Sequence, residues 1–289
     1  CNMYKSIVTE IVKRQKPKLL LINASAFSYC NSNLTDEVYL RKWIDNMPMS
    51  QNKLDTVKTI PKNINNDDEK VKDNISDTLY FPLEKYHGNW KAPEAVYTSF
   101  VTRAYMRLSG GGYLKGFYSK TGITGGRDNL ANIGQPTKEA YVLTDECRAY
   151  LKELLSYCNK LGIEHVLLLQ PPHETQAADK SGLEQIESIT REYGYDFLDL
   201  STDYESIAGI DDSHDFADFE HLNAYGAKKL TAYIGDMAVN QYGIKSDTAK
   251  SELSRWKKSV KRTKKALKMA GEYTDRGEAQ VVGEYEAAK

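Results

Sequence analysis

The chain has almost no net charge, few cysteines and no long apolar run, and each of these features argues against a class of protein. Its 39 basic and 40 acidic side chains give a formal charge of −1, so no global field favours nucleic acid as a partner. Its four cysteines contain no C-x-x-C pair, which argues against a zinc site or a disulfide framework. No run reaches the ~20 apolar residues that span a bilayer. What remains is an ordinary globular composition, 40% apolar and 27% charged.

The cysteines are better explained as buried thiols. Cys147 and Cys158 fall on the apolar face of one predicted helix, where free cysteine behaves as a small apolar side chain. The first residue is Cys1 and not methionine, so we expect a processed product, an engineered product or a fragment. A lipid-modified N-terminal cysteine is an open alternative.

Apolar periodicity predicts helices that alternate with short strands. Thr144 is expected to cap a helix that stops at Gly162, and Asn223 is expected to cap another. Leu19–Ile22 is wholly apolar, as is typical of a parallel strand covered on both faces. Further strands are expected at 166–169 and 197–200. This alternation predicts an α/β fold in three layers, a parallel sheet with helices on both faces.

Three regions follow from changes in composition. Residues 1–245 are predicted to form the α/β domain, in which 31–137 is a large loop-rich insertion. Residues 246–289 are predicted to form a basic helical tail, with Trp256 and Val260 on one helix face among many lysines. That tail is either a solvated helix or a basic surface that meets a membrane or an acidic polymer.

The most informative segment is the acidic loop before the helix that Asn223 caps. Asp218 and His221 stand three residues apart, so the carboxylate can accept the Nδ1 hydrogen of the imidazole and leave Nε2 free. An imidazole held in this way takes a proton from a hydroxyl nucleophile and returns it to the leaving group. The pair is therefore predicted to be the base of an acyl-transfer site and the group that orients it.

The same block carries a family resemblance. Asp218-x-x-His221-Leu222-Asn223-x-x-Gly226-Ala227 resembles the last motif of SGNH/GDSL hydrolases, and is similar to the bacterial extracytoplasmic branch of teichoic-acid D-alanyl transfer and polysaccharide O-acetylation proteins. The resemblance extends to Lys16–Leu19, Asn52-Lys53 and Tyr86-His87-x-x-Trp90. It implies a flavodoxin-like sheet, a Ser-His-Asp site without metal or organic cofactor, and cleavage or transfer of acyl esters, often on carbohydrate.

The serine that this family requires is missing from its usual turn. Family members carry it in a Gly-Asp-Ser or Gly-Ser-Ser turn after the first strand, and the chain has no such turn. One account places that strand and its serine before Cys1. Another makes Ser25 the nucleophile and Asn23 an oxyanion donor, and a third treats both as ordinary strand-end residues.

Other residues enter the prediction as substrate contacts or metal ligands. His87 and Trp90 lie in the predicted insertion, and His173 follows a predicted strand where substrate contacts are expected. Each histidine can equally be a packed structural residue. A metal site is the alternative for the acidic loop, with nitrogen and oxygen ligands from His214, Asp215, Asp218 and His221, although no metal is predicted.

These observations favour an esterase or O-acyltransferase that acts on acylated carbohydrate or a small ester. The alternative is a non-catalytic module on the same fold that binds carbohydrate or a partner through aromatic side chains. The resemblance further implies an extracytoplasmic location, an anchor upstream of residue 1 and a possible membrane-bound partner.

Overall fold

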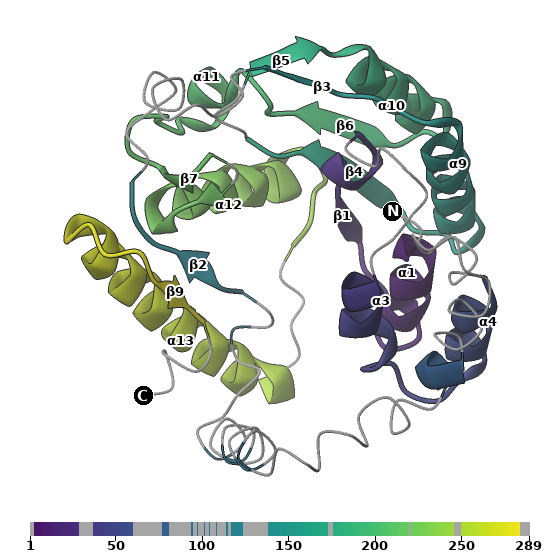
Figure 1. The fold of residues 1–289 in the computed structure, drawn as a ribbon, viewed down its shortest axis with the longest axis horizontal. Helices are drawn as coiled ribbons and strands as arrows, with labels where there is room; N and C mark the ends of the chain where they lie inside the picture. Colours follow the sequence, from purple (N-terminus) through teal and green to yellow (C-terminus); the bar gives the residue numbers. More distant parts are fainter. Residues whose placement is uncertain are drawn as a thin grey trace. The chain divides into compact units, whose positions relative to one another are not determined.

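A computed structural model of the chain describes residues 3–28, 37–59, 77–80, 117–123, 138–172, 176–219, 221–245 and 250–283, with six single residues between 94 and 114 (Figure 1). The fold is mixed α/β. It comprises two compact units. Unit 1 combines residues 1–96, 140–169 and 179–198, and unit 2 combines 97–139, 170–178 and 199–289.

Unit 1 is organised around a three-stranded parallel sheet in the order β1-β4-β6. The strands are β1 (Leu19–Asn23), β4 (His165–Gln170) and β6 (Asp196–Asp199). β1 pairs with β4 in parallel, with Leu20 opposite Val166. The parallel sheet with alternating helices confirms the α/β prediction at this level.

The position of β1 corrects one expectation. Leu20 and Ile22 are buried, but Leu21 between them is 46% exposed. Among the described strands β1 is at the edge of the sheet, whereas the central strand β4 is buried from Val166 to Gln170. An all-apolar run was expected to be covered on both faces, and that description fits β4 and not β1.

The long helices of unit 1 follow their sequence signals closely. α9 (Asp145–Lys160) is capped by Thr144, whose hydroxyl accepts the Cys147 N–H at 3.2 Å. It ends before Gly162, which has a φ of 68° that suits glycine. Cys147 and Cys158 are buried free thiols as predicted, and burial raises the pKa of Cys158 to about 11. Cys1 and Cys30 lie outside the described residues.

Unit 1 also contains α1 (Tyr4–Val12), α2 (Ser25–Ser28) and α10 (Ser181–Glu192). α10 contacts both α9 and α2, and α1 contacts α9. α1 buries Val8, α2 buries Phe27, and α10 buries Leu183, Ile186 and Ile189.

Part of the predicted loop-rich region is helical. α3 (Glu37–Ile44) and α4 (Gln51–Thr59) contact each other, and α4 contacts α1 (Figure 1). Leu40, Ile44 and Val57 form their common core. Asn52 ties α4 to α1, since its amide donates to the Ser6 carbonyl at 3.1 Å and to Glu10 at 2.8 Å. The prediction missed these helices because they span only 8 and 9 residues, too few for an apolar period to show clearly, and α4 has few apolar positions.

Unit 2 is built from short strands and two long helices. The helices of this unit that the structure describes over their whole length are α11 (Tyr204–Ala208), α12 (Ala224–Asn240) and α13 (Lys250–Asp275). β2 (Ser119–Lys120) pairs antiparallel with β9 (Val281–Val282), and β7 (Phe216–Asp218) pairs antiparallel with β8 (His221–Leu222). A further two-stranded pair joins β3 (Lys138–Ala140) and β5 (Gln176–Asp179).

The predicted tail helix is part of the core of unit 2. α13 contacts α12, β2 and β9, and Ala266 and Ala270 are fully buried with Val282 (Figure 1). Trp256 and Val260, predicted to share one helix face, are half-exposed. The packed face of α13 carries alanines, whose small side chains let the helix backbone approach its neighbours closely. Within the described ranges, none of the helices combines the length and apolar character needed to cross a membrane.

Candidate functional site

Asp218 and His221 face each other across the short β7–β8 hairpin of unit 2. The two residues are paired in the strand register, which shifts between Phe216 and Asp218. His221 Nδ1 lies 2.8 Å from Asp218 Oδ1, and both side chains are partly exposed. The contact that the three-residue spacing predicts is therefore present, in a hairpin and not in a helical turn.

This contact fixes the tautomer of the imidazole. A carboxylate oxygen at 2.8 Å requires a hydrogen on Nδ1, since two lone pairs would repel each other at that distance. When the ring is neutral this leaves the lone pair on Nε2, and no hydrogen bond to Nε2 is found among the described residues. An imidazole held in this way can accept a proton at Nε2.

Lys120 of β2 is a third member of this cluster. Its Nζ donates to Asp218 Oδ2 at 2.9 Å and lies 3.1 Å from His221 Nδ1. Because Nδ1 carries a hydrogen, the ammonium bonds to the carboxylate, and its distance to the ring is a close approach only. Asp218 is therefore held by one oxygen toward His221 and by the other toward Lys120.

Lys120 was not predicted from the sequence, because it stands 98 residues before Asp218 in the region predicted to be an insertion. Lys229 was also not predicted. Neither lysine stands at a spacing from its aspartate that a sequence motif would reveal, because the folded chain brings each pair together.

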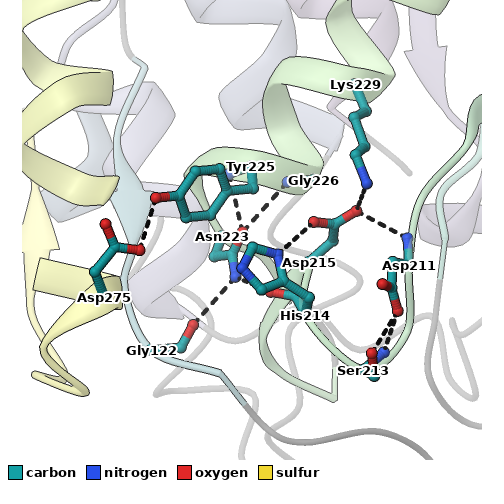
Figure 2. A network of polar contacts seen from close by, with 10 residues as sticks. All are labelled: Gly122, Asp211, Ser213, His214, Asp215, Asn223, Tyr225, Gly226, Lys229 and Asp275. Carbon is teal, nitrogen blue, oxygen red and sulfur yellow. Dashed lines mark hydrogen bonds and ion pairs between the residues drawn. The ribbon is translucent and has the colours of Figure 1, made fainter. Parts of the chain in front are cut away.

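The motif residues after His221 have identifiable structural roles (Figure 2). Asn223 caps α12, accepting from the Tyr225 and Gly226 N–H groups at 2.9 and 3.2 Å. Its amide donates to the carbonyls of His214 at 2.6 Å and Gly122 at 3.2 Å. This one buried side chain closes the acidic loop, starts the helix and holds the segment that follows β2.

Gly226 is required by close packing. A Cβ at this position would lie 2.4 Å from the Asp215 carbonyl oxygen and 2.9 Å from Leu222 Cδ2. A Cβ atom essentially never lies within 3 Å of a non-bonded backbone atom, so any side chain here would displace the loop from the helix.

The fully buried carboxylate of Asp215 holds the loop from inside. It accepts from the Asp211 N–H at 2.8 Å, from Lys229 at 2.6 Å and from His214 Nδ1 at 3.0 Å (Figure 2). A buried carboxylate is tolerated only when it is paired and hydrogen-bonded in this way. Asp211 in turn accepts from the Ser213 hydroxyl and N–H, which lowers the pKa of its carboxyl.

Tyr225 connects the loop to α13. Its ring packs on His214 with centroids 4.8 Å apart, and its hydroxyl donates to Asp275 at 2.7 Å. The bond to Asp275 raises the pKa of Tyr225. The start of α12 is thereby fixed to the end of α13 (Figure 2).

The metal-ligand alternative is not supported. His214 pairs with Asp215 and His221 pairs with Asp218, so the four residues act as two separate pairs. Across the described ranges, the group of acidic, histidine or cysteine side chains with mutually close ligand atoms is Glu205, Asp211 and Asp212, on the surface.

Asn23 and Ser25 lie in unit 1, at the end of β1 and the start of α2. Asn23 Oδ1 accepts from the Ser25 N–H at 2.9 Å and from the Ser25 hydroxyl at 2.7 Å. Since a backbone N–H must meet an oxygen, Asn23 turns its acceptor and not its amide toward Ser25. These are the contacts of a strand-end cap, and the catalytic roles of both residues stay predictions.

The predicted substrate contacts His87, Trp90 and His173 lie outside the described residues and stay predictions. No protein-family model, curated protein or solved structure matches the chain. The case for a function therefore rests on the residues themselves.

Proposed function

We propose that Asp218 and His221 are the orienting acid and general base of an SGNH-type site, in an esterase or O-acyltransferase that acts on acyl esters of cell-surface carbohydrate. The observation that carries the proposal is the 2.8 Å contact between His221 Nδ1 and Asp218 Oδ1, with Nε2 left without a described partner. That arrangement is what a hydroxyl nucleophile requires of its base.

The chemistry uses Nε2 twice. It accepts the proton of a serine hydroxyl as the oxygen attacks the acyl carbonyl, and then gives that proton to the departing alcohol oxygen. The acyl group is left on the serine. Water or a sugar hydroxyl then attacks the acyl carbon while His221 again accepts the proton, and His221 returns that proton to the serine oxygen as the bond between this oxygen and the acyl carbon breaks. Asp218 stabilises the imidazolium in both steps, and no cofactor is needed.

The fold and the motif support this proposal independently. A parallel sheet with alternating helices is compatible with the flavodoxin-like three-layer fold of SGNH proteins. Asn223 and Gly226 have the structural roles that would keep them next to a working His221. Placement outside the cytoplasm, near a membrane-bound partner, rests on the resemblance and belongs to the proposal.

The test compares ester hydrolysis by the complete gene product and its variants, with an acetylated chromogenic ester as substrate. We expect His221→Ala and Asp218→Asn to lower kcat/KM on the order of 10³-fold. His214→Ala is the matched control, since it removes the other histidine of the loop, which is also paired with an aspartate. Equal activity in wild type and His221→Ala would overturn the proposal, and no ester hydrolysis by the wild type would favour the non-catalytic binding module.

A fluorophosphonate probe identifies the nucleophile. The attacking serine oxygen forms a bond to phosphorus and fluoride leaves, so the modified peptide is found by mass spectrometry. Labelling should depend on His221. If the label falls on Ser25, then Ser25→Ala should abolish both labelling and turnover, and a label elsewhere would exclude the Ser25 account.

A further inference from the structure

The long helix α13 carries a strong excess of positive charge. It contains nine basic and three acidic residues, and none of the acidic residues lies between 253 and 271. The basic residues are Lys250, Arg255, Lys257, Lys258, Lys261, Arg262, Lys264, Lys265 and Lys268. A charged helix that is only solvated usually alternates the sign of its charges. This one does not.

The lysines point away from the unit to which the helix belongs. The buried side of α13 is formed by Ser259, Ala266, Ala270 and Thr274. With 3.6 residues per turn, Lys257, Lys261 and Lys264 lie roughly 180° around the helix from that side. All three are exposed. The docking of α13 therefore fixes which face is presented to the outside.

Most of these charges are not neutralised. Arg255 pairs with Glu252 at 3.4 Å, and Lys268 pairs with Glu272 at 3.6 Å. Five lysines between these pairs have no acidic partner within the described part of the chain. They are Lys257, Lys258, Lys261, Lys264 and Lys265. A concentrated, unpaired positive face attracts a polyanionic surface.

Beside the lysines runs an exposed apolar strip. Leu253, Trp256 and Val260 are 42%, 48% and 49% exposed, and their spacing places them on adjacent turns of one side. Tryptophan and aliphatic side chains next to lysines are typical of helices that lie in the headgroup region of a bilayer. A soluble polyanion would bind the charges but would gain nothing from the strip.

We infer that the exposed face of α13 binds the surface of an anionic lipid bilayer. The lysines contact the anionic headgroups, and Leu253, Trp256 and Val260 insert at the headgroup level. The inference is independent of the proposed catalytic function, since it uses none of the residues around His221.

The first test is co-sedimentation of the complete chain with vesicles of phosphatidylcholine alone or with about 30% phosphatidylglycerol. We expect binding only to the anionic vesicles and a decrease with salt. Lys257→Gln/Lys261→Gln/Lys264→Gln should weaken the binding to anionic vesicles by about 100-fold, because the loss of each lysine should weaken this binding by about fivefold. The matched control Lys58→Gln/Lys152→Gln/Lys160→Gln removes the same charge from exposed sites of unit 1 and should bind like wild type. Equal losses in the two variants, or no binding to anionic vesicles, would overturn the inference.

A second pair of measurements separates lipid from a soluble polyanion. Leu253→Ser/Val260→Ser should lose at least about tenfold in vesicle binding but keep its binding to polyphosphate. In a Trp43→Phe/Trp90→Phe background, anionic vesicles should shift the Trp256 emission to the blue. Polyphosphate binding without vesicle binding would show that the helix binds a soluble polymer instead, and an unshifted emission on vesicles would show that Trp256 does not insert; either result would overturn the inference. Circular dichroism of each variant checks that α13 is intact.

Discussion

The carboxylate of Asp218 is held through both of its oxygens. His221 occupies Oδ1 at 2.8 Å and Lys120 occupies Oδ2 at 2.9 Å, from two different elements of unit 2. A carboxylate with both oxygens engaged cannot rotate without breaking a charge-assisted bond. Lys120 therefore acts on the imidazole through Asp218, as a positioning residue.

At this scale we expect Lys120→Met to lower the kcat/KM of ester hydrolysis by about fivefold, because a partly exposed ion pair contributes up to about 1 kcal/mol. Lys120→Arg keeps the charge and should recover most of the activity. The ¹⁵N shifts of the His221 ring should still report a hydrogen on Nδ1. Lys228→Met removes an exposed lysine of α12 as the control, and an equal loss there would refute a positioning role for Lys120.

At the scale of elements, the junction between the acidic loop and α12 is the feature that places His221. Asn223 satisfies N–H groups of α12 and carbonyls on two other segments, and Gly226 lets the helix meet the Asp215 backbone. Both the Asn223 cap and Gly226 are therefore needed to place the start of α12 against the acidic loop. These motif residues serve packing as well as chemistry.

Gly226→Ala should destabilise the protein by about 2 kcal/mol or more, because its methyl group would collide with a main-chain oxygen. Gly235→Ala in the same helix is the matched control. An added Cβ there meets nothing within 4 Å, so alanine should stabilise by about 0.5–1 kcal/mol through its better helix propensity. Urea unfolding measures both changes, and the same sign for the two variants would contradict the packing argument.

At the scale of the whole unit, the C-terminal segment supports the strand that carries Lys120. β9 pairs with β2, opposing Val281 to Lys120. The next residue is Thr121. Its N–H donates to the backbone carbonyl of Gln280, and its hydroxyl donates to the backbone carbonyl of Glu278. The region after residue 245 is therefore a structural part of the candidate site.

Enlarging a buried alanine of α13 should show this dependence. Ala270→Leu overfills the fully buried face, and we expect a loss of about 1–3 kcal/mol in the free energy of unfolding, together with lower ester hydrolysis. Lys265→Leu adds the same side chain on the exposed face and should leave both unchanged. If Ala270→Leu unfolds like wild type, α13 is not part of the core.

The sequence predicted the elements with strong local signals. Thr144 and Asn223 cap helices, Gly162 follows one, and the Asp218–His221 spacing yields the expected contact. It failed at β1, and it did not predict that α13 packs into unit 2, because an apolar pattern does not show which face of an element other elements will cover. The helices α3 and α4, of 8 and 9 residues, are too short to show a clear apolar period.

Local chemistry was thus determined by the sequence alone: caps, glycine positions, an α/β alternation and a histidine three residues from an aspartate. Only the tertiary structure decided that Lys120 meets Asp218 and that α13 is docked through its alanines with its lysines facing outward. These pairings join residues about 100 or more apart or depend on which face is buried. Long-range contact of that kind follows from how elements pack, which no local spacing encodes.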